Sequence, residues 1–261
     1  MRVDARRSQE PQDEGAGVAE RSRFDEQLAA VLSDGGPQSA QRICELCIDT
    51  LPVTGAAITA MTSNEHQSTV WASDDVAVRI DELQFRLGEG PCVEAFTSRA
   101  PVLITDIAAE PDLRWPVFAA AAARDTTARG MYVFPLLGGP ISIGVLDFYR
   151  DRPGDFEPED IARARRASQA AFWSVLAARP GHTLGPSGEP RHDDESDDWP
   201  SDMALERREV YQATGMIIAQ LDVSADAALA TLRAHAFVHD RPIDAVARDV
   251  VARTLRFGEV R

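Results

Sequence analysis

The stretch RREVYQATGMIIAQL, residues 207–221, has the apolar period of an amphipathic helix and carries a glycine in its middle. Gly215 costs such a helix about 1 kcal/mol relative to alanine, so a close approach of another group to its backbone is the natural compensation. That group is either a neighbouring helix of the same chain or a binding partner. The side chains that form the apolar stripe at helical period are Val210, Ala213, Ile217, Ile218 and Leu221.

Two more amphipathic segments follow this helix. Ser224 is a typical N-cap for the second, and Pro242 suits the first turn of the third. We expect the third helix to run through Leu255 and to close at Gly258. The apolar positions are Ala228, Leu229, Leu232 and Ala236 in the second helix and Ile243, Val246, Ala247, Val250, Val251 and Leu255 in the third. Residues 203–261 therefore predict an all-α domain of three helices.

Three motifs occur in order along these helices: Gln212-Ala213-Thr214-Gly215-Met216-Ile217-Ile218, Ala228-x-x-x-Leu232-Arg233 and Ile243-x-x-Val246-Ala247-x-x-Val250-Val251. Together they resemble the ANTAR domain, a three-helix RNA-binding module of bacterial antitermination regulators, and this spacing is more specific than a short motif. The resemblance implies binding to RNA stem-loops in nascent transcripts, so that a competing terminator hairpin does not form, and it implies no catalysis. Thr214 departs from the family, which often has a lysine at this position.

Candidate RNA-binding residues follow from the resemblance and from the placement of the arginines. Residues 203–261 hold eight arginines and eight acids, so affinity must come from a local patch and from shape or base contacts. Arg241 and Arg248 are two helical turns apart and so share a face. The alternative is that the arginines only form i,i+4 pairs on a solvated surface. The candidate RNA-binding residues are Gln212, Ala213, Thr214, Gly215, Arg233, Arg241 and Arg248.

The composition of the whole chain limits the remaining possibilities. Its 261 residues, 44% of them hydrophobic, predict two domains. The formal net charge of -15 argues against a general binder of nucleic acid or anionic membrane and confines any RNA contact to one region. No apolar run reaches the roughly 20 residues of a membrane span, and the N-terminus lacks the apolar core of a signal peptide. We therefore expect a cytoplasmic protein without a membrane partner.

Two stretches without apolar period divide the chain. Residues 1–22 are polar and charged, which is typical of a disordered leader. Residues 180–202 are first rich in proline and glycine and then acidic, which is typical of a flexible linker. The linker acids either fold back onto the arginines of the C-terminal domain, in competition with RNA, or only keep the tether soluble. A first folded region over residues 23–179 and the helical domain over residues 203–261 remain.

The first folded region alternates helical and strand patterns. We expect helices over residues 24–32, 43–51, 75–85, 115–124 and 157–178. We expect strands over residues 56–61, 68–72, 102–104, 132–136 and 141–149, the last two paired as a hairpin. Four motifs stand within this order: Leu87-Gly-Glu-Gly-Pro-Cys92-Val-Glu-Ala, Pro101-Val-Leu-Ile-Thr-Asp106, Arg114-Trp115-Pro116 and Gly144-Val145-Leu146.

These motifs resemble a GAF domain, in the form found fused to ANTAR domains. The resemblance implies an antiparallel sheet with helices on one face, which acts as a ligand or redox sensor and as a dimerisation platform. The fold class is therefore α+β, with a GAF-like antiparallel sheet flanked by helices followed by the all-α ANTAR-like domain. We expect a homodimer formed through the helices near residues 24–33 and 157–178, and a small-molecule ligand in the sensor, whose identity and any cofactor stay open.

The three cysteines decide whether an enzyme is a competing interpretation. Cys44 and Cys47 lie in a helical pattern without further ligands, which predicts buried thiols rather than a metal site. Cys92 begins a helix, where it either fills a tight turn or has its pKa lowered by the helix dipole. Gly88-x-Gly90-x-Cys92 is similar to the active-site loop of free-methionine sulfoxide reductases, which are GAF-fold thiol enzymes. That enzyme, and a scaffold whose helices only dimerise, are the alternatives to a non-enzymatic RNA-binding regulator.

Overall fold

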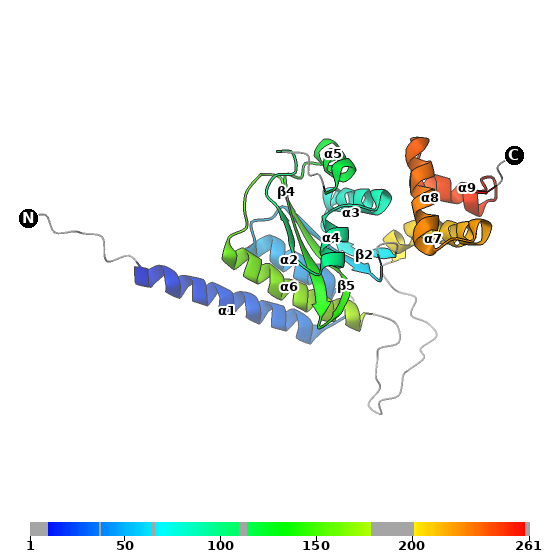
Figure 1. Ribbon diagram of the computed structural model, residues 1–261. Helices are drawn as coiled ribbons and strands as arrows, with labels where there is room; N and C mark the ends of the chain where they lie inside the picture. The colour runs from blue at the N-terminus through cyan, green and yellow to red at the C-terminus, as the bar shows by residue number, and fades with distance from the viewer. Residues whose placement is uncertain (1–9, 37, 64–65, 110–113, 179–200, 259–261) are drawn as a thin grey trace, which may run out of the picture.

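A five-stranded antiparallel sheet organises the N-terminal region of the computed structural model (Figure 1). The structure describes residues 10–36, 38–63, 66–109, 114–178 and 201–258. The strands are β1 (Gly55–Met61), β2 (Gln67–Ala72), β3 (Val102–Ile104), β4 (Gly130–Gly138) and β5 (Ile141–Arg150). Their spatial order is β2-β1-β5-β4-β3, so β2 and β3 are the edge strands. All five strands expected from the sequence are confirmed, and β4 begins two residues earlier than predicted.

Helices cover both faces of this sheet. The helices α1 (Glu10–Asp34), α2 (Ser39–Thr50) and α6 (Pro158–Ala177) pack on one face, and α3 (Asp75–Leu87), α4 (Pro91–Ser98) and α5 (Pro116–Asp125) pack on the other. Successive residues of β4 alternate between the two cores, with Tyr132 and Phe134 in the first and Met131 and Val133 in the second. The single helical face implied by the family resemblance is wrong for this chain, because its sheet is apolar on both sides.

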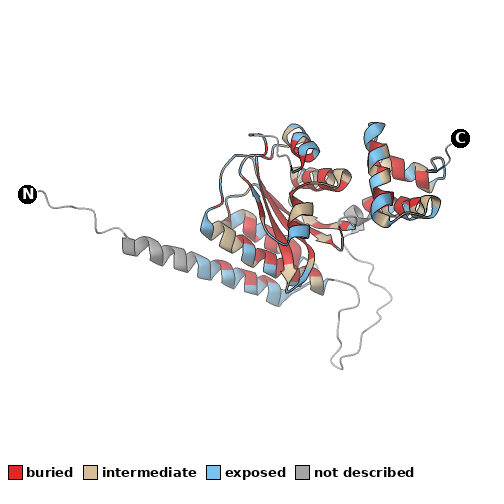
Figure 2. Cartoon of the chain, in the orientation of Figure 1, coloured by how far each residue is buried: buried red, intermediate tan, exposed pale blue. Residues whose placement is uncertain are grey.

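The last three helices form the expected all-α domain. They are α7 (Ser201–Leu221), α8 (Ala225–Val238) and α9 (Ile243–Val251), packed around a third core (Figure 2). Ser224 caps α8 as predicted, because its hydroxyl accepts a hydrogen bond from the amide of Ala227 at 3.3 Å. Phe85 of α3 belongs to this third core, so the C-terminal domain packs directly against the first region beside α3 and β2 (Figure 1).

The N-terminal boundary differs from the prediction. The helix α1 begins at Glu10, so residues 10–22 are helical rather than a disordered leader. This segment holds three glutamates and two alanines, whose helix propensity is high, and two glycines, whose propensity is low; it continues the helix that Phe24, Leu28 and Val31 anchor in the first core. Residues 1–9 of the expected leader lie outside the described residues. The expected linker also lies outside them up to residue 200, and α7 already begins at Ser201.

The third helix of the C-terminal domain is shorter than predicted. It ends at Val251, because Arg253 adopts a left-handed φ of 62° and the amides of Thr254 and Leu255 both donate to the carbonyl of Asp249. Leu255 still packs on the third core, from the turn that follows the helix. Gly258 does not close α9; it has a φ of 94° and lies against Leu221 of α7.

Candidate functional site

One side of α7 is open to solvent and includes two of the predicted RNA-binding residues. Gln212 and Gly215 are exposed, together with Arg208 and Ala219, at the spacing of one helix face. A Cβ placed on Gly215 would meet no atom within 4 Å among the described residues, and its backbone is not left-handed. Packing against a neighbouring helix is therefore not the reason for this glycine. Arg208, which the sequence analysis did not single out, supplies a positive charge one turn before Gln212.

Two other residues of the same motif do not reach the surface. Ala213 is fully buried in the third core, and the side chain of Thr214 is buried with its hydroxyl bonded to the carbonyl of Val210 at 2.8 Å. Their prediction as RNA-binding residues is wrong for this structure, because both side chains belong to the inner side of α7. The motif therefore contributes Gln212 and the backbone at Gly215 to the open surface, while Ala213 and Thr214 hold the helix in place.

Arg241 and Arg248 lie at the surface but are already paired. Arg241 contacts Asp249 at 2.8 Å, and Arg248 contacts Asp244 at 2.7 Å and Glu209 of α7 at 3.4 Å. The hydrogen bond that Arg248 donates to Asp244, together with the charge of Asp244, raises the pKa of Arg248 above its usual value. Exposed pairs of this kind contribute little to stability, so an RNA phosphate can replace the carboxylates at small cost. Both arginines remain candidates for RNA binding. The i,i+4 pair of Arg248 with Asp244 also fits the alternative that the arginines only form such pairs on a solvated surface.

Arg233 points at α3 rather than at the open surface. Its Nε donates to the carbonyl of Phe85 at 2.9 Å, and its guanidinium carbon lies 5.5 Å from the centre of the Phe85 ring. The Gly88 backbone at the end of α3 lies so close that a Cβ there would be 2.6 Å from the Arg233 guanidinium. The predicted phosphate contact is therefore covered in this structure by the first domain.

A buried ion pair lies at the centre of the contact between the two domains. Arg207 in the first half of α7 pairs with Asp81 of α3, and both side chains are less than a tenth exposed. Arg207 also donates to the carbonyl of Gln67 at 3.2 Å and lies over the Phe85 ring, with 4.2 Å between its guanidinium carbon and the ring centre. The Asp81 carboxylate also accepts hydrogen bonds from the hydroxyls of Thr59 and Thr69.

Tyr211 completes this interdomain contact on the edge of the sheet. Its hydroxyl accepts a hydrogen bond from the amide of Gln67 at 2.8 Å and donates to the carbonyl of the same residue. Its ring stacks on His66, with 5.2 Å between ring centres, and meets the edge of Phe85 at 6.1 Å. The sequence analysis missed Arg207, Tyr211 and their partners, since the contacts join residues more than a hundred positions apart.

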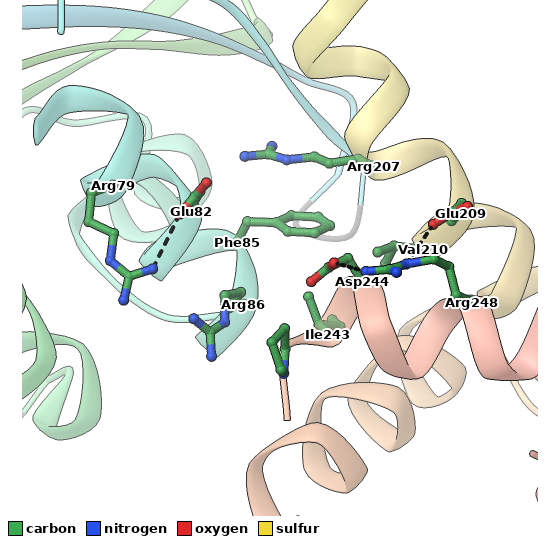
Figure 3. Close-up of a pocket in the computed structure, with 11 residues that line it drawn as sticks. Arg79, Glu82, Phe85, Arg86, Arg207, Glu209, Val210, Ile243, Asp244 and Arg248 are labelled. Atoms are coloured by element: carbon green, nitrogen blue, oxygen red, sulfur yellow. Dashed lines mark hydrogen bonds and ion pairs between the residues drawn. The ribbon is translucent and has the colours of Figure 1, made fainter. Parts of the chain in front are cut away.

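A cleft opens beside this contact, between α3 and the start of α7 and α9 (Figure 3). Its volume is about 490 Å³, and Phe85, Val210 and Ile243 line it together with charged side chains. Arg79 pairs with Glu82 at 3.2 Å on one side, and Arg248 pairs with Asp244 on the other. The described lining carries four arginines, Arg79, Arg86, Arg207 and Arg248, and three acids, Glu82, Glu209 and Asp244.

The inner sensor region holds a much smaller cavity. It lies between the sheet and α3, has a volume of about 10 Å³ and is lined by Asp81, Asp147 and Tyr149 among others. A volume of this size holds roughly one water molecule. Because Ala77, Ile80 and Asp81 of α3 form one of its walls, a larger ligand can enter only if α3 moves.

Cys92 is a buried thiol next to this cavity. Its Sγ lies 3.0 Å from both carboxylate oxygens of Asp147, and Gln84 bonds both its sulfur, at 2.6 Å, and its amide, at 2.7 Å. Burial raises the pKa of the Cys92 thiol well above its usual value, and the Asp147 charge adds to the effect. Of the two alternatives for Cys92, a pKa lowered by the helix dipole is contradicted, because the desolvation of the buried thiolate dominates.

The other two cysteines lie in a different core. Cys44 and Cys47 are buried free thiols on α2, as predicted, and belong to the core on the opposite face of the sheet from Cys92. Burial raises the pKa of both thiols. A thiol reductase needs an accessible thiolate with a resolving cysteine in reach, and the three described cysteines do not provide that arrangement.

No single helix in the described part of the chain is long and apolar enough to cross a bilayer. The segments Arg207–Leu221 and Ala225–Val238 reach that length and apolarity only together, and they are bent by 108° relative to each other.

Comparisons with known proteins match both parts of the chain. The family model of the GAF domain matches residues 37–172, and that of the ANTAR domain matches residues 203–251. Among solved structures, the chain is similar to the GAF domain of a phosphoenolpyruvate-protein phosphotransferase from Coxiella burnetii, with 12% identity, a TM-score of 0.50 and coverage of 62% of this chain and 94% of that chain. It is also similar to the free methionine-R-sulfoxide reductase from Neisseria meningitidis, with 15% identity, a TM-score of 0.45 and coverage of 62% and 93%. A search of curated proteins gave no match.

Proposed function

The chain belongs to the GAF domain family and carries an ANTAR domain, and from this premise we propose that it binds RNA stem-loops in nascent transcripts and promotes transcription antitermination. Its architecture is that of a regulator rather than of an enzyme. In this proposal residues 23–179 are the sensor, residues 180–202 the linker and residues 203–261 the RNA-binding domain. Because nascent transcripts are its targets, the protein acts in the cytoplasm.

The observation that carries the proposal is the open backbone at Gly215. A glycine in mid-helix weakens folding, and here no described residue of the chain fills the space that its missing side chain leaves. At this point an RNA backbone or loop base can approach α7 more closely than it could if position 215 carried a side chain. Gln212 offers donor and acceptor groups to base edges, and Arg208 on the same face offers a charge to phosphate.

The test is a selection from RNA hairpins with randomised loops against the full chain. We expect hairpins with a shared loop sequence to be enriched, because RNA-binding modules read unpaired loop bases. Arg208→Ala should weaken their binding and reduce the slope of log affinity against log salt by about one, as the loss of one phosphate contact does. Arg129→Ala, which removes an exposed arginine from the sensor domain, is the matched control. A selection that enriches no hairpin would contradict the proposal.

The proposed sensor responds to a small molecule or to redox state, and α3 is the element that would report it. The water-sized cavity beside Asp147 is bounded by α3, and Gln84 of the same helix bonds Cys92. A ligand that enlarges the cavity, or a change at Cys92, must therefore displace α3. The reductase alternative is disfavoured by the buried, protonated state of the Cys92 thiol.

We further propose a homodimer formed through α1 and α6. The small side chains of α6 do not form this interface, since Ala164, Ala167 and Ala171 are buried in the core between α6 and the sheet. The outer face of α6 instead carries Trp173, whose exposed fraction is 59%, and α1 exposes Leu32. Two linked RNA-binding domains would hold paired stem-loops more tightly than one, because the second contact becomes intramolecular.

A further inference from the structure

The face of the ANTAR domain that α3 covers has the composition of a nucleotide-binding surface. It consists of the guanidinium groups of Arg207 and Arg233 and the ring of Tyr211, all three of which contact the Phe85 ring, and we call it the covered face. Proteins bind unpaired nucleotides with this combination, in which arginines contact phosphate or stack on bases and an aromatic ring stacks on a base. The covered face is separate from the open stripe of α7, because Arg207 and Tyr211 contact α3 and β2 while Gln212 and Gly215 face solvent.

The groups that α3 places on the covered face are of the same chemical types as those of a nucleotide: an anion, a flat ring and a hydrogen-bond acceptor. Asp81 gives Arg207 a carboxylate where a nucleotide has its phosphate. One helical turn later, Phe85 gives a flat ring that lies 4.2 Å from the Arg207 guanidinium and 5.5 Å from that of Arg233, and that meets Tyr211 edge-on. The Phe85 carbonyl, which accepts from Arg233 at 2.9 Å, offers a second acceptor. An anion and a ring on one short segment are the two features by which such a face recognises a nucleotide.

We propose that the covered face, Arg207, Tyr211 and Arg233, is a second RNA-binding site and that α3 occupies it as an intramolecular competitor. The inference rests on the proposed RNA-binding function and adds to it a site and its regulation. RNA and α3 cannot hold Arg207 at the same time, so the docked chain shown here binds RNA only through the open stripe of α7. Full binding requires α3 to leave.

The chemistry of the contact suits such an exchange. A buried ion pair stabilises a docked state only weakly, because the desolvation of both ions offsets most of their attraction. RNA phosphate and bases would restore to Arg207 and Arg233 the same kinds of contact that they lose from α3. Asp81 would keep the hydroxyl groups of Thr59 and Thr69 as partners after release, so the sensor core is not left with an unpaired carboxylate.

The test uses the full chain, a hairpin returned by the selection above, and Asp81→Asn, which removes the competing anion and keeps the side-chain shape. We expect Asp81→Asn to bind the hairpin about tenfold more tightly than the original chain and to show a larger radius of gyration in X-ray scattering. In the Asp81→Asn background, Arg207→Ala should abolish this gain, whereas Arg129→Ala should not. Phe85→Ala is the second release variant, in case the asparagine disturbs the sensor core, and it should act in the same direction.

Three results would overturn the inference, and they can be told apart. If no variant binds any hairpin of the randomised pool, the proposed function fails and this inference fails with it. If RNA binds but both release variants expand without a gain in affinity, α3 is not a competitor. If Arg207→Ala and Arg129→Ala behave alike in the released background, the covered face is not an RNA-binding site, although the open stripe of α7 is.

Discussion

Gly215 and Gly139 show how the same residue type serves two different purposes. A Cβ on either would meet no atom within 4 Å among the described residues. Gly139 turns the β4–β5 hairpin with a φ of 60°, a conformation that side chains disfavour, so its reason lies in folding. Gly215 lies within an ordinary helix and has no such reason. This difference separates a glycine that the backbone conformation requires from one whose missing side chain leaves room for a partner.

Gly215→Ala should therefore raise the free energy of unfolding by roughly 0.5–1 kcal/mol, because alanine is the better helix former and its methyl group meets open space. RNA affinity should fall in the same variant. Urea unfolding and hairpin binding measure the two effects. Gly139→Ala is the control and should lower stability, since its φ is positive. A more stable Gly215→Ala chain with unchanged RNA affinity would show that no partner approaches this backbone.

Asp147 makes the stability of the sensor depend on pH. Burial raises the pKa of Asp147 to about 7, and the charge of Asp81 adds to this, while the hydrogen bond from Cys92 opposes it. An unfolded aspartate has a pKa of about 3.9. The folded chain therefore keeps a proton that the unfolded chain has already released, and stability falls as the pH rises between these two values.

The slope of this fall should be at most about 1.4 kcal/mol per pH unit between roughly pH 4 and pH 7, the value for one proton. Asp147→Asn should remove that part of the pH dependence, because asparagine stays neutral throughout. Urea unfolding at a series of pH values measures it in the original chain and the variant. Equal slopes in the two proteins would mean that Asp147 ionises normally in the folded state.

The helices and strands were predictable wherever burial sets a period. The strands of the central sheet and the helices α2, α3, α5 and α6 follow from apolar periodicity and caps, because each lies against one of the two sheet cores. The extension of α1 and the end of α9 did not follow, since one has no apolar period and the other is ended by a left-handed residue, Arg253.

The outer face of α6 leads to a prediction about assembly. Trp173→Glu should shift a dimer to monomer at micromolar concentration, because it places a charge in the middle of the proposed interface. Its effect on the unfolding of the monomer should be small, since the Trp173 side chain is 59% exposed. Phe237→Glu on α8 is the control, with a more exposed ring at 68% that lies in the other domain. Light scattering gives the masses, and an unchanged mass for Trp173→Glu would place the interface elsewhere or nowhere.

The docking of the two domains is the feature that the sequence concealed. It joins Asp81 to Arg207 across 126 positions and Gln67 to Tyr211 across 144, and no local pattern marks either pair. Sequence reasoning found Arg233 and the motif around Gly215 as functional, but could not show that one is covered and the other open. The acids that the sequence suggested as competitors for the arginines lie in the linker, outside the described residues, while the acid that reaches Arg207 belongs to α3.

The edge strand β2 offers a direct measure of whether RNA opens the molecule. The Gln67 amide has the Tyr211 hydroxyl as its acceptor, at 2.8 Å, and is therefore protected by the ANTAR domain. Adding RNA should accelerate hydrogen exchange at Gln67, because the release of α7 removes that acceptor, while Leu146 in the centre of the sheet should not change. Tyr211→Phe gives the reference, since it removes the acceptor without RNA. A ligand that favours the docked state should slow exchange at Gln67 and weaken RNA binding, and by reciprocity RNA should weaken the binding of that ligand by the same factor. If RNA binds fully and exchange at Gln67 stays slow, both domains remain docked, and binding uses the open stripe of α7 alone.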